Sequence, residues 1–319
     1  MDSQALLTFV AIHRAGGVSA AALELSRTQP AISRRLALLE DEVGAPLFER
    51  VAGGVVLSAA GRALLPHAER VLSAVRDAES AMQALRAEGG GPVSLAAVGT
   101  LAGANLSAVL RIFAAEQPKA ELSIRTATSA EISDIVRRGE ATIGLRYLLG
   151  PAADLECDLI GVETLRVVCR ADHKLAGKAI ASLAMLRDET WFAFPNAFAH
   201  RETYADNVFA QFQAHGVGAI KWQPVDSQSA QKRLIEAGFG LALLPDSAIH
   251  EELRARTLAA IDVADLRVGN PVYAVTRKGG YLSPASARLL ALLRQLGVTR
   301  PQSPACARRP KARSRRHVT

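Results

Sequence analysis

The side chains best suited to chemistry with another molecule lie between Ser26 and Arg34. Hydroxyl, amide and guanidinium groups follow one another there, and such groups hydrogen-bond to base edges and phosphate oxygens in protein–DNA complexes. Two helical patterns flank a tight corner and must position these groups. Thr28 is expected to be the N-cap of the second helix, and Pro30 suits its first turn, where no N–H group is needed.

The helix that follows the corner has one apolar face. Its apolar residues recur at the spacing of a stripe that packs on a core: Ile32, Leu36, Leu39 and Val43. Gln29, Ser33 and Arg34 lie off this stripe and can contact a partner. Periodicity alone leaves two interpretations open, a helix that contacts DNA or a small helical bundle with a solvated polar face.

A longer pattern covers the same segment. An Ala-Ala helix, a Ser-x-x-Gln-Pro-Ala-x-Ser corner, a Leu-Glu pair and a Gly-x-x-Leu-Phe-x-Arg ending follow one another in fixed register: Ala21, Ala22, Leu25, Ser26, Gln29, Pro30, Ala31, Ser33, Leu39, Glu40, Gly44, Leu47, Phe48 and Arg50. This pattern resembles the winged helix-turn-helix of LysR-type transcriptional regulators, with Val43 where the family usually has Leu. We therefore expect residues 1–58 to form a winged helix-turn-helix DNA-binding domain.

The resemblance implies which side chains contact double-stranded DNA. Gln29, Ser33 and Arg34 would enter the major groove from the start of the recognition helix. Phosphate contacts would come from residues at the corner and at the base of the wing: Ser26, Arg27, Thr28 and Arg50. Pro30 belongs to the same DNA-binding set. The cationic wing residue that is common in the family near Gly53 is absent from this sequence.

Residues 59–88 are expected to form one long linker helix. Its apolar residues alternate at spacings of four and three, and we assign all but Ala68 to a dimer interface: Leu64, Ala68, Val71, Val75, Ala78, Met82 and Leu85. This narrow stripe predicts a coiled coil, although a long helix packed on its own protein is the alternative. Two paired chains would present two recognition helices to a palindromic operator. The resemblance implies a homodimer or homotetramer that contacts RNA polymerase.

The chain from about 91 to 298 alternates strand-like and helical patterns, which predicts a mostly parallel α/β sheet. Two lobes fit this length, lobe I over 91–163 and 267–298 and lobe II over 164–266. The segment Glu236–Pro245 carries an Ala-Gly-x-Gly-x-x-x-x-Pro sequence that resembles the effector-binding domain of the same family. The resemblance implies an α/β multidomain protein whose C-terminal part is bilobed, of the periplasmic-binding-protein type.

A small-molecule effector is expected between the lobes, where strand carboxyl ends and helix N-termini meet. Thr100 follows the first strand and would place its hydroxyl beside free backbone N–H groups. The resemblance adds the other effector-binding residues: Thr128, Ser129, Arg146, Asn196 and Gln228. Arg146 and the Thr100 helix terminus favour an anionic effector such as a carboxylate. In the alternative, Thr100 and Ser129 only cap helices and Arg146 is a surface cation.

Composition restricts the class of protein. The 319 residues contain no apolar run long enough to cross a bilayer and no secretory signal pattern, so we expect a cytoplasmic protein with no membrane partner. The three cysteines are far apart and no metal-binding or cofactor motif is present, so neither metal nor cofactor is expected. The net charge of +7 comes from residues 299–319, since the rest has 31 basic and 31 acidic residues. This basic tail is expected to be disordered.

These patterns favour a LysR-type regulator whose promoter binding responds to a small-molecule effector. The alternatives are a solute-binding receptor and an enzyme that use the same bilobed fold. The missing signal pattern and the presence of residues 1–58 argue against a receptor. The sequence also has no nucleophile motif, metal spacing or P-loop, which argues against an enzyme.

Overall fold

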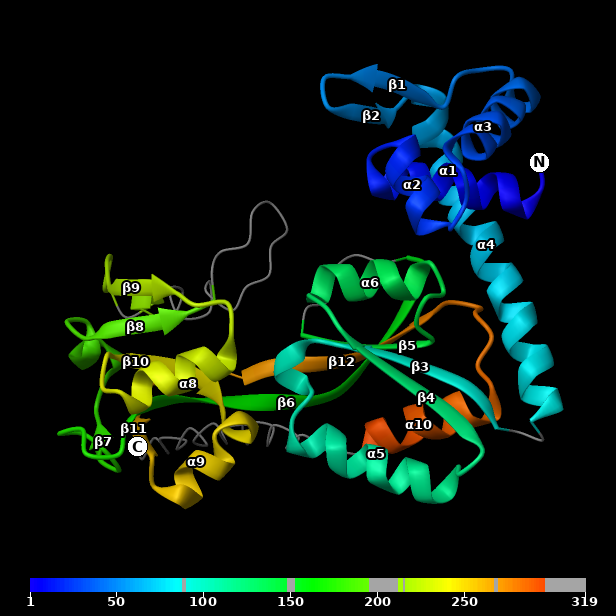
Figure 1. The fold of residues 1–319 in the computed structure, drawn as a ribbon. Coiled ribbons are helices and arrows are strands. Elements are labelled where there is room, and N and C mark those ends of the chain that lie inside the picture. The colour runs from blue at the N-terminus through cyan, green and yellow to red at the C-terminus, as the bar shows by residue number, and fades with distance from the viewer. Residues whose placement is uncertain (88–89, 148–152, 195–211, 215, 267–268, 296–319) are drawn as a thin grey trace, which may run out of the picture.

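The computed structural model describes residues 1–87, 90–147, 153–194, 212–214, 216–266 and 269–295. Three parts follow one another along the chain: a small N-terminal domain, a long helix that leads away from it, and a two-lobed domain (Figure 1). The predicted basic tail and Asn196 lie outside the described residues.

Three helices and a hairpin form the N-terminal domain: α1 (Ser3–Ala15), α2 (Val18–Glu24), α3 (Gln29–Val43), β1 (Phe48–Val51) and β2 (Gly54–Leu57). Phe9 and Leu47 are fully buried at its centre, and the Phe9 ring lies 5.4 Å from that of Phe48. The predicted stripe on α3 holds through Ile32 and Leu39, which are buried. Val43 is exposed, so the packed face ends one turn earlier than the pattern indicated.

The hairpin, which is the wing, is fixed to the turn between α1 and α2. The Val55 N–H donates to the Gly16 carbonyl over 3.2 Å. Any Cβ at Gly54 would lie 2.5 Å from that same carbonyl oxygen, and Gly54 has a φ of +159°. Only glycine permits this close approach, so the wing has a fixed position relative to the helices.

Helix α4 (Ala59–Arg86) joins this domain to the rest of the chain. Ser58 begins it by accepting from the Gly61 N–H at 3.0 Å and donating to the Pro46 carbonyl at 2.6 Å. The first half of α4 packs on the N-terminal domain through Ala68 and Leu72. Most of the predicted dimer stripe, from Val71 onward, is exposed: Val71, Val75, Ala78, Met82 and Leu85.

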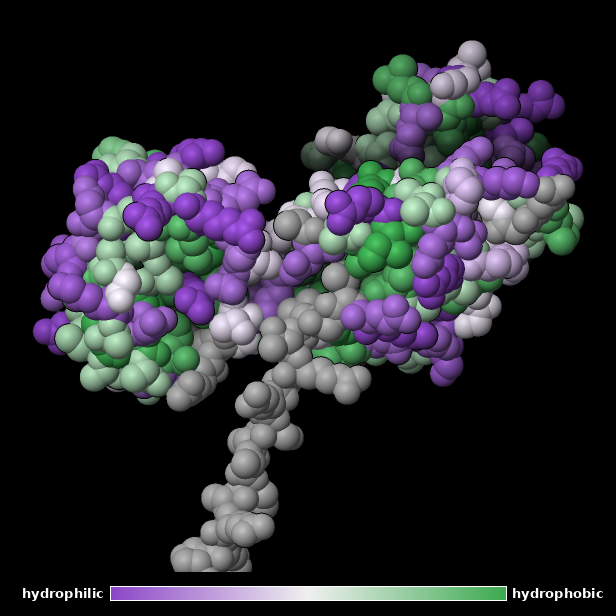
Figure 2. Space-filling model, turned by 90° about the horizontal axis from the view of Figure 1, so that it is seen from below, coloured by the Kyte–Doolittle hydropathy of each residue, from purple (hydrophilic) through white to green (hydrophobic). Residues whose placement is uncertain are grey.

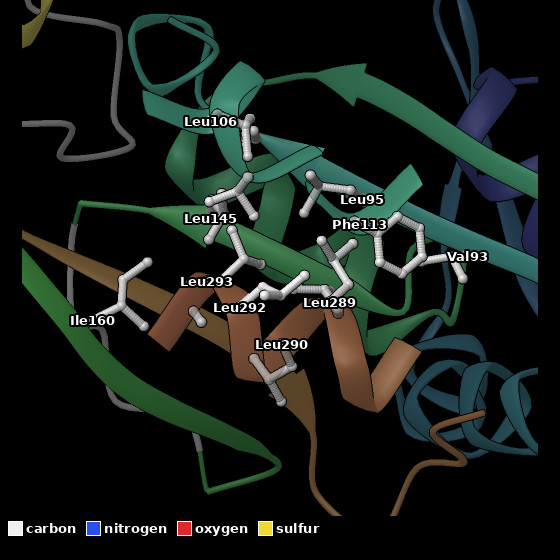
Figure 3. Packing of buried hydrophobic residues seen from close by; sticks show 14 of the residues in the cluster. Val93, Leu95, Leu106, Phe113, Leu145, Ile160, Leu289, Leu290, Leu292 and Leu293 are labelled. Carbon is white, nitrogen blue, oxygen red and sulfur yellow. The ribbon is translucent and has the colours of Figure 1, made fainter. Parts of the chain in front are cut away.

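Lobe I, which lies beside α4 in Figure 1, is built around three parallel strands. Its elements are β3 (Gly91–Ala97), η1 (Gly99–Leu101), α5 (Ala104–Glu116), β4 (Ala120–Thr126), α6 (Ser129–Arg137), β5 (Ile143–Arg146) and α10 (Pro284–Gln295). Leucines of α10 meet Phe113 and Leu95 in its core (Figure 3). Because α5 and α10 cover one face of the sheet and α6 the other, lobe I has a core on each side.

Lobe II repeats this arrangement with shorter strands. It contains β7 (Ala179–Ile180), η2 (Leu183–Leu186), β8 (Thr190–Ala193), β9 (Lys221–Pro224), α8 (Gln228–Glu236), β10 (Leu241–Pro245), η3 (Asp246–Ala248), α9 (His250–Ala255) and β11 (Leu258–Val263). Trp191 is fully buried and meets Phe212 edge-on, with ring centroids 5.0 Å apart. The lobes are separate bodies in the space-filling view (Figure 2).

Two long strands join the lobes, β6 (Leu155–Arg170) and β12 (Gly269–Arg277). The sheet order is β4-β3-β5-β12-β6-β10-β8-β9, with β11 also paired to β6. Strand β6 pairs antiparallel with β12 in lobe I and with β10 and β11 in lobe II. The sheet is mixed. The pairs among β3, β4 and β5 and among β8, β9 and β10 are parallel, as expected, whereas the shared strands β6 and β12 run antiparallel to their neighbours.

Among the described residues, no single helix is long and apolar enough to cross a membrane. The helices Ser3–Ala15 and Val18–Glu24 meet the length and composition requirement only as a pair, bent by 114°.

Candidate DNA-binding surface and inter-lobe site

The corner between α2 and α3 is set by backbone geometry. Helix α2 ends at Glu24. The Arg27 N–H donates back to the Ala22 carbonyl over 2.8 Å, and Ser26 adopts a φ of +51°. A left-handed backbone conformation is uncommon for residues other than glycine. At Ser26 it turns the chain sharply, and α3 begins three residues later at Gln29.

The predicted DNA-contacting residues gather at this corner, and all of them are exposed: Ser26, Arg27, Thr28, Gln29, Pro30, Ser33 and Arg34. Thr28 is the N-cap of α3, but within the described chain its side chain makes no capping hydrogen bond. The N–H groups of the first turn are thus left without a side-chain acceptor at the positive end of the helix dipole. Such an end suits a phosphate oxygen.

Arg50 lies on the wing rather than at the corner. It is exposed on β1, opposite Val55 of β2. The wing and α3 both lie at the end of the N-terminal domain that points away from lobe I (Figure 1). A duplex laid along this end could meet both elements.

The two lobes face each other through the carboxyl ends of their parallel strands. Thr100 lies in η1, directly after β3, and Tyr147 directly after β5. Ser247 lies in η3, directly after β10 of lobe II. Ligands of open α/β sheets bind outside such strand ends.

A chain of hydrogen bonds joins these strand ends across the junction. The Thr100 hydroxyl donates to the Tyr147 hydroxyl over 2.9 Å, which in turn donates to Glu163 Oε2 over 2.8 Å. From lobe II, the Ser247 hydroxyl donates to Glu163 Oε1 over 2.7 Å. Glu163 lies on the shared strand β6, so its carboxyl group connects both lobes.

Glu163 is the buried acid of this network, with 5% of its surface exposed. Burial raises the pKa of its carboxyl group, and the hydrogen bonds from Ser247 and Tyr147 oppose that rise. Both carboxyl oxygens have partners. The carboxyl group of Glu163 therefore connects the two lobes through both of its oxygens.

The other predicted effector residues have different surroundings. Ser129 is buried, and its hydroxyl accepts from the Tyr147 N–H at 3.4 Å, which places it beside the network. Thr128 forms a capping box with Glu131, so its hydroxyl is already engaged. Gln228 begins α8, and its buried Nε2 has no hydrogen-bond partner among the described residues.

Arg146 is buried rather than a surface cation, with 4% exposed. Successive residues of a strand point to opposite faces, so Arg146 faces away from Tyr147. Its Nη2 lies 3.8 Å from the Cys157 sulfur, on the α6 side of the sheet. The alternative of an exposed Arg146 is wrong, and the arginine does not join the Thr100 network within the described chain.

Glu163 and Ser247 were not predicted as site residues. One signal for Glu163 was available, namely an acid in a strand-like run, because burying a carboxylate is costly unless it is partnered. Ser247 carried no comparable signal, because its role depends on how lobe II meets lobe I.

Comparison with known proteins decides the family. A model of the LysR substrate-binding domain matches residues 86–297, and a model of the bacterial regulatory helix-turn-helix of the lysR family matches residues 3–62. The chain belongs to the LysR family. It is a LysR-type transcriptional regulator with an N-terminal helix-turn-helix and a C-terminal effector-binding domain, and the predicted fold class is confirmed.

Relatives of this regulator match over nearly its whole length. CbbR of Rhodospirillum rubrum is 28% identical over 296 residues, covering 91% of this chain and 95% of CbbR. TcbR of a Pseudomonas species is 30% identical, covering 87% of this chain and 93% of TcbR. A crystal structure of full-length CbnR in complex with target DNA is 28% identical with a TM-score of 0.55, covering 93% of this chain and 99% of CbnR. Both named relatives are transcriptional regulators.

The raised pKa of Glu163 predicts a pH dependence of stability. Between the ordinary value of 4.5 and the raised one, the folded state binds more protons than the unfolded state, so stability falls as pH rises through this window. Glu163→Gln cannot titrate, and the decline in melting temperature above pH 4.5 should become shallower than in the wild type. Glu121→Gln, at an exposed lobe I carboxylate, is the control. Equal slopes for wild type and Glu163→Gln would contradict the assignment.

Proposed function

We propose that this regulator reads promoter DNA with the start of α3. Gln29, Ser33 and Arg34 contact base edges in the major groove. Ser26, Arg27 and Thr28 contact phosphates at the corner, Arg50 does so from the wing, and Pro30 starts the helix. The observation that carries this proposal is the exposed corner with an uncapped helix N-terminus.

Gln29→Ala and Arg34→Ala should each weaken binding to DNA beside the protein's own gene roughly 5- to 150-fold, since a base contact contributes about 1–3 kcal/mol. Gel-shift titration measures the affinity, and sedimentation tests whether the oligomer persists. Arg111→Ala, an exposed arginine of α5, is the matched control. Unchanged affinity in both corner variants would reject the recognition helix.

We propose that two chains pair along the exposed stripe of α4. Val71, Val75, Met82 and Leu85 are 45%, 38%, 52% and 72% exposed. Leu64 instead packs beside the core of its own N-terminal domain, so its role in pairing is the least supported of the set. A second helix laid on this stripe would remove these apolar side chains from water.

Met82→Glu should dissociate the dimer, because pairing would bury an unpartnered carboxylate at a cost of several kcal/mol. Gln83→Glu introduces the same charge at the next residue, off the stripe, and should leave the dimer intact. Analytical ultracentrifugation of the full chain measures both. The interface is misassigned if the two variants dissociate alike, or if the wild type is monomeric.

We propose that a small molecule binds at the junction of the lobes, among Thr100, Ser129 and Gln228. Tyr147, Glu163 and Ser247, which form the network there, belong to the same site. The unpartnered Gln228 Nε2 favours an effector with an oxygen acceptor, of which a carboxylate is one case. Arg146 gives less support to an anionic effector than its position in the sequence indicated, because its side chain lies on the other face of the sheet from Tyr147.

Such a molecule would act by differential binding to two arrangements of the lobes. A ligand that replaces the Tyr147 or Ser247 hydrogen bond to Glu163 favours the arrangement in which that bond is broken. A change between lobes then changes how paired chains sit on DNA, and the coupling is reciprocal between effector and operator.

A thermal-shift screen of the full chain against metabolites, weighted toward carboxylates, should give a specific hit that is lost in Thr100→Val. A ligand at a hundredfold excess over its Kd stabilises the folded state by about 2.7 kcal/mol, a readily measured change. Thr257→Val, an exposed threonine between α9 and β11, should retain the hit. A hit that survives in Thr100→Val would move the effector away from this junction.

We propose domains over 1–58, 59–88 and 91–298, with lobes divided at 163–164 and at 266–267, where β6 and β12 cross. We also propose that the protein is a cytoplasmic regulator rather than an enzyme or a transport receptor. Turnover by the purified chain would reopen the enzyme alternative.

A further inference from the structure

A hollow lies between the linker helix α4 and lobe I, apart from the inter-lobe junction. Its interior volume is about 50 Å³, and it is partly open to solvent. Arg76, Asp77 and Ser80 of α4 form one wall. Ser94 of β3, Thr142 and Arg277 of β12 belong to the opposite wall. Polar groups thus dominate both sides of the hollow.

Arg277 is a partly buried cation whose hydrogen bonding is incomplete. One nitrogen, Nη2, pairs with Asp77, and the side chain is 15% exposed. Another, Nη1, is buried without a hydrogen-bond partner in the described part of the chain. Such a group is rare in folded proteins, because the lost hydration is not replaced.

The guanidinium group is held in place by its surroundings. Gly139 has a φ of +68°, and a Cβ there would lie 2.8 Å from Arg277 Nη1. Gly280 also packs on this side chain, and a Cβ there would lie 3.0 Å from Nε and Nη2. The absence of side chains at these two glycines leaves room for the guanidinium group of Arg277 and restricts its orientation. A planar guanidinium group in a fixed orientation suits an oxyanion, because its N–H donors match the oxygens of the anion.

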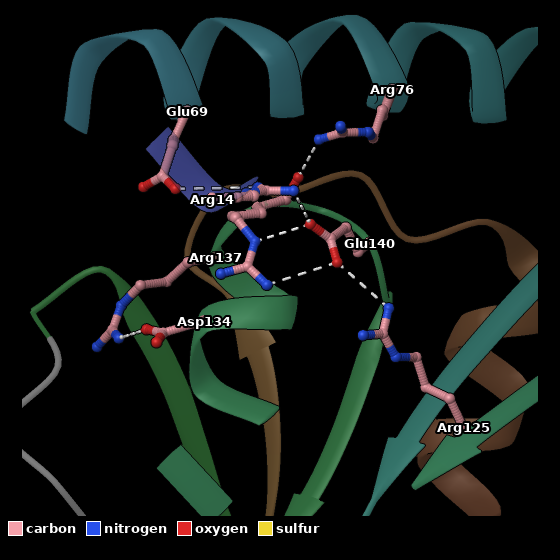
Figure 4. A network of polar contacts seen from close by, with 8 residues as sticks. Arg14, Glu69, Arg76, Arg125, Asp134, Arg137 and Glu140 are labelled. Atoms are coloured by element: carbon pink, nitrogen blue, oxygen red, sulfur yellow. Dashed lines mark hydrogen bonds and ion pairs between the residues drawn. The ribbon is translucent and has the colours of Figure 1, made fainter. Parts of the chain in front are cut away.

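Arg76 is a second cation at the hollow, and Glu140 and Glu79 are the acidic groups near it. It donates to the Arg138 carbonyl oxygen, which is uncharged. The nearby carboxylate of Glu140 is already shared by three guanidinium groups, those of Arg14 at 2.7 Å, Arg138 at 2.7 Å and Arg125 at 3.2 Å (Figure 4). Burial of the Arg76 side chain lowers the pKa of its guanidinium group. Among the residues that line the hollow, Asp77 balances one of the two cations, and one positive charge is left over.

We propose that this hollow is a second binding site, which takes a small oxyanion such as a phosphate or carboxylate group. Arg277 and Arg76 would hold its oxygens from the two walls, and the Ser80 hydroxyl would donate from α4. Hydrogen bonds between ionised partners are the strong ones, and an arginine can bind an oxyanion through two of its N–H groups. The bound ion would connect lobe I to the helix that carries the DNA-binding domain.

This site is independent of the proposed effector site. It uses none of Thr100, Tyr147, Glu163 or Ser247, and it lies on the α4 side of lobe I. An ion bound here would fix the direction in which α4 leaves lobe I, whatever occupies the junction of the lobes.

The test is thermal unfolding of the full chain in inorganic phosphate, and separately in acetate, against sodium chloride at equal ionic strength and pH. Wild type should show a saturable rise in melting temperature with at least one of the two anions. Arg277→Gln should weaken the apparent affinity at least tenfold. Arg288→Gln, at an exposed lobe I arginine that pairs with Glu116, should leave it unchanged.

Two further variants separate the remaining outcomes. Ser80→Leu fills the hollow from α4 and keeps both partners of the Arg277–Asp77 pair, and it decides the question should Arg277→Gln fail to fold. Arg34→Gln removes a cation of the recognition helix, which can itself bind phosphate. No saturable rise with either anion would overturn the proposal. So would a rise that persists in Ser80→Leu, or one that disappears in Arg34→Gln instead.

Discussion

The continuous strand β6 is the constraint on which the effector domain depends. Its first half is hydrogen-bonded to β12 in lobe I, and its second half to β10 and β11 in lobe II. Neither lobe can turn against the other without bending this strand where the partners change. Glu163 lies at that point and binds Tyr147 from one lobe and Ser247 from the other. The change of strand partners along β6 and the hydrogen bonds of Glu163 therefore lie at the same place between the lobes.

Helix α4 carries this constraint to the DNA-binding domain. Its first half shares a core with α1, and its second half lies against lobe I through Arg76 and Asp77. Arg14 of α1 also reaches Glu140 of lobe I, 2.7 Å away. A movement of lobe I can thus be transmitted to the N-terminal domain through helix α4 and through the ion pairs around Glu140.

The parts that could be predicted from sequence are those whose signals are local. The corner, the recognition helix and the long linker helix follow from capping residues and apolar spacing within a few turns. The first half of β6 and all of β11 were not predicted, because their pairing depends on distant strands. The same reason applies to the site. Thr100 and Ser129 follow their own strands, whereas Ser247 reaches Glu163 only after lobe II has folded against lobe I. The sequence also could not tell which face of β5 Arg146 would occupy.

The most direct test of the account is a footprint of the full-length protein on the DNA beside its own gene. Two α4 helices paired as proposed would carry two recognition helices, so protection should cover two half-sites related by a two-fold axis and separated by about one helical turn of 10–10.5 base pairs or a multiple of it. Loss of both half-sites together in Met82→Glu would show that pairing along α4 sets the geometry. A single protected half-site, or none, would contradict the central claim that dimers joined through α4 read an operator.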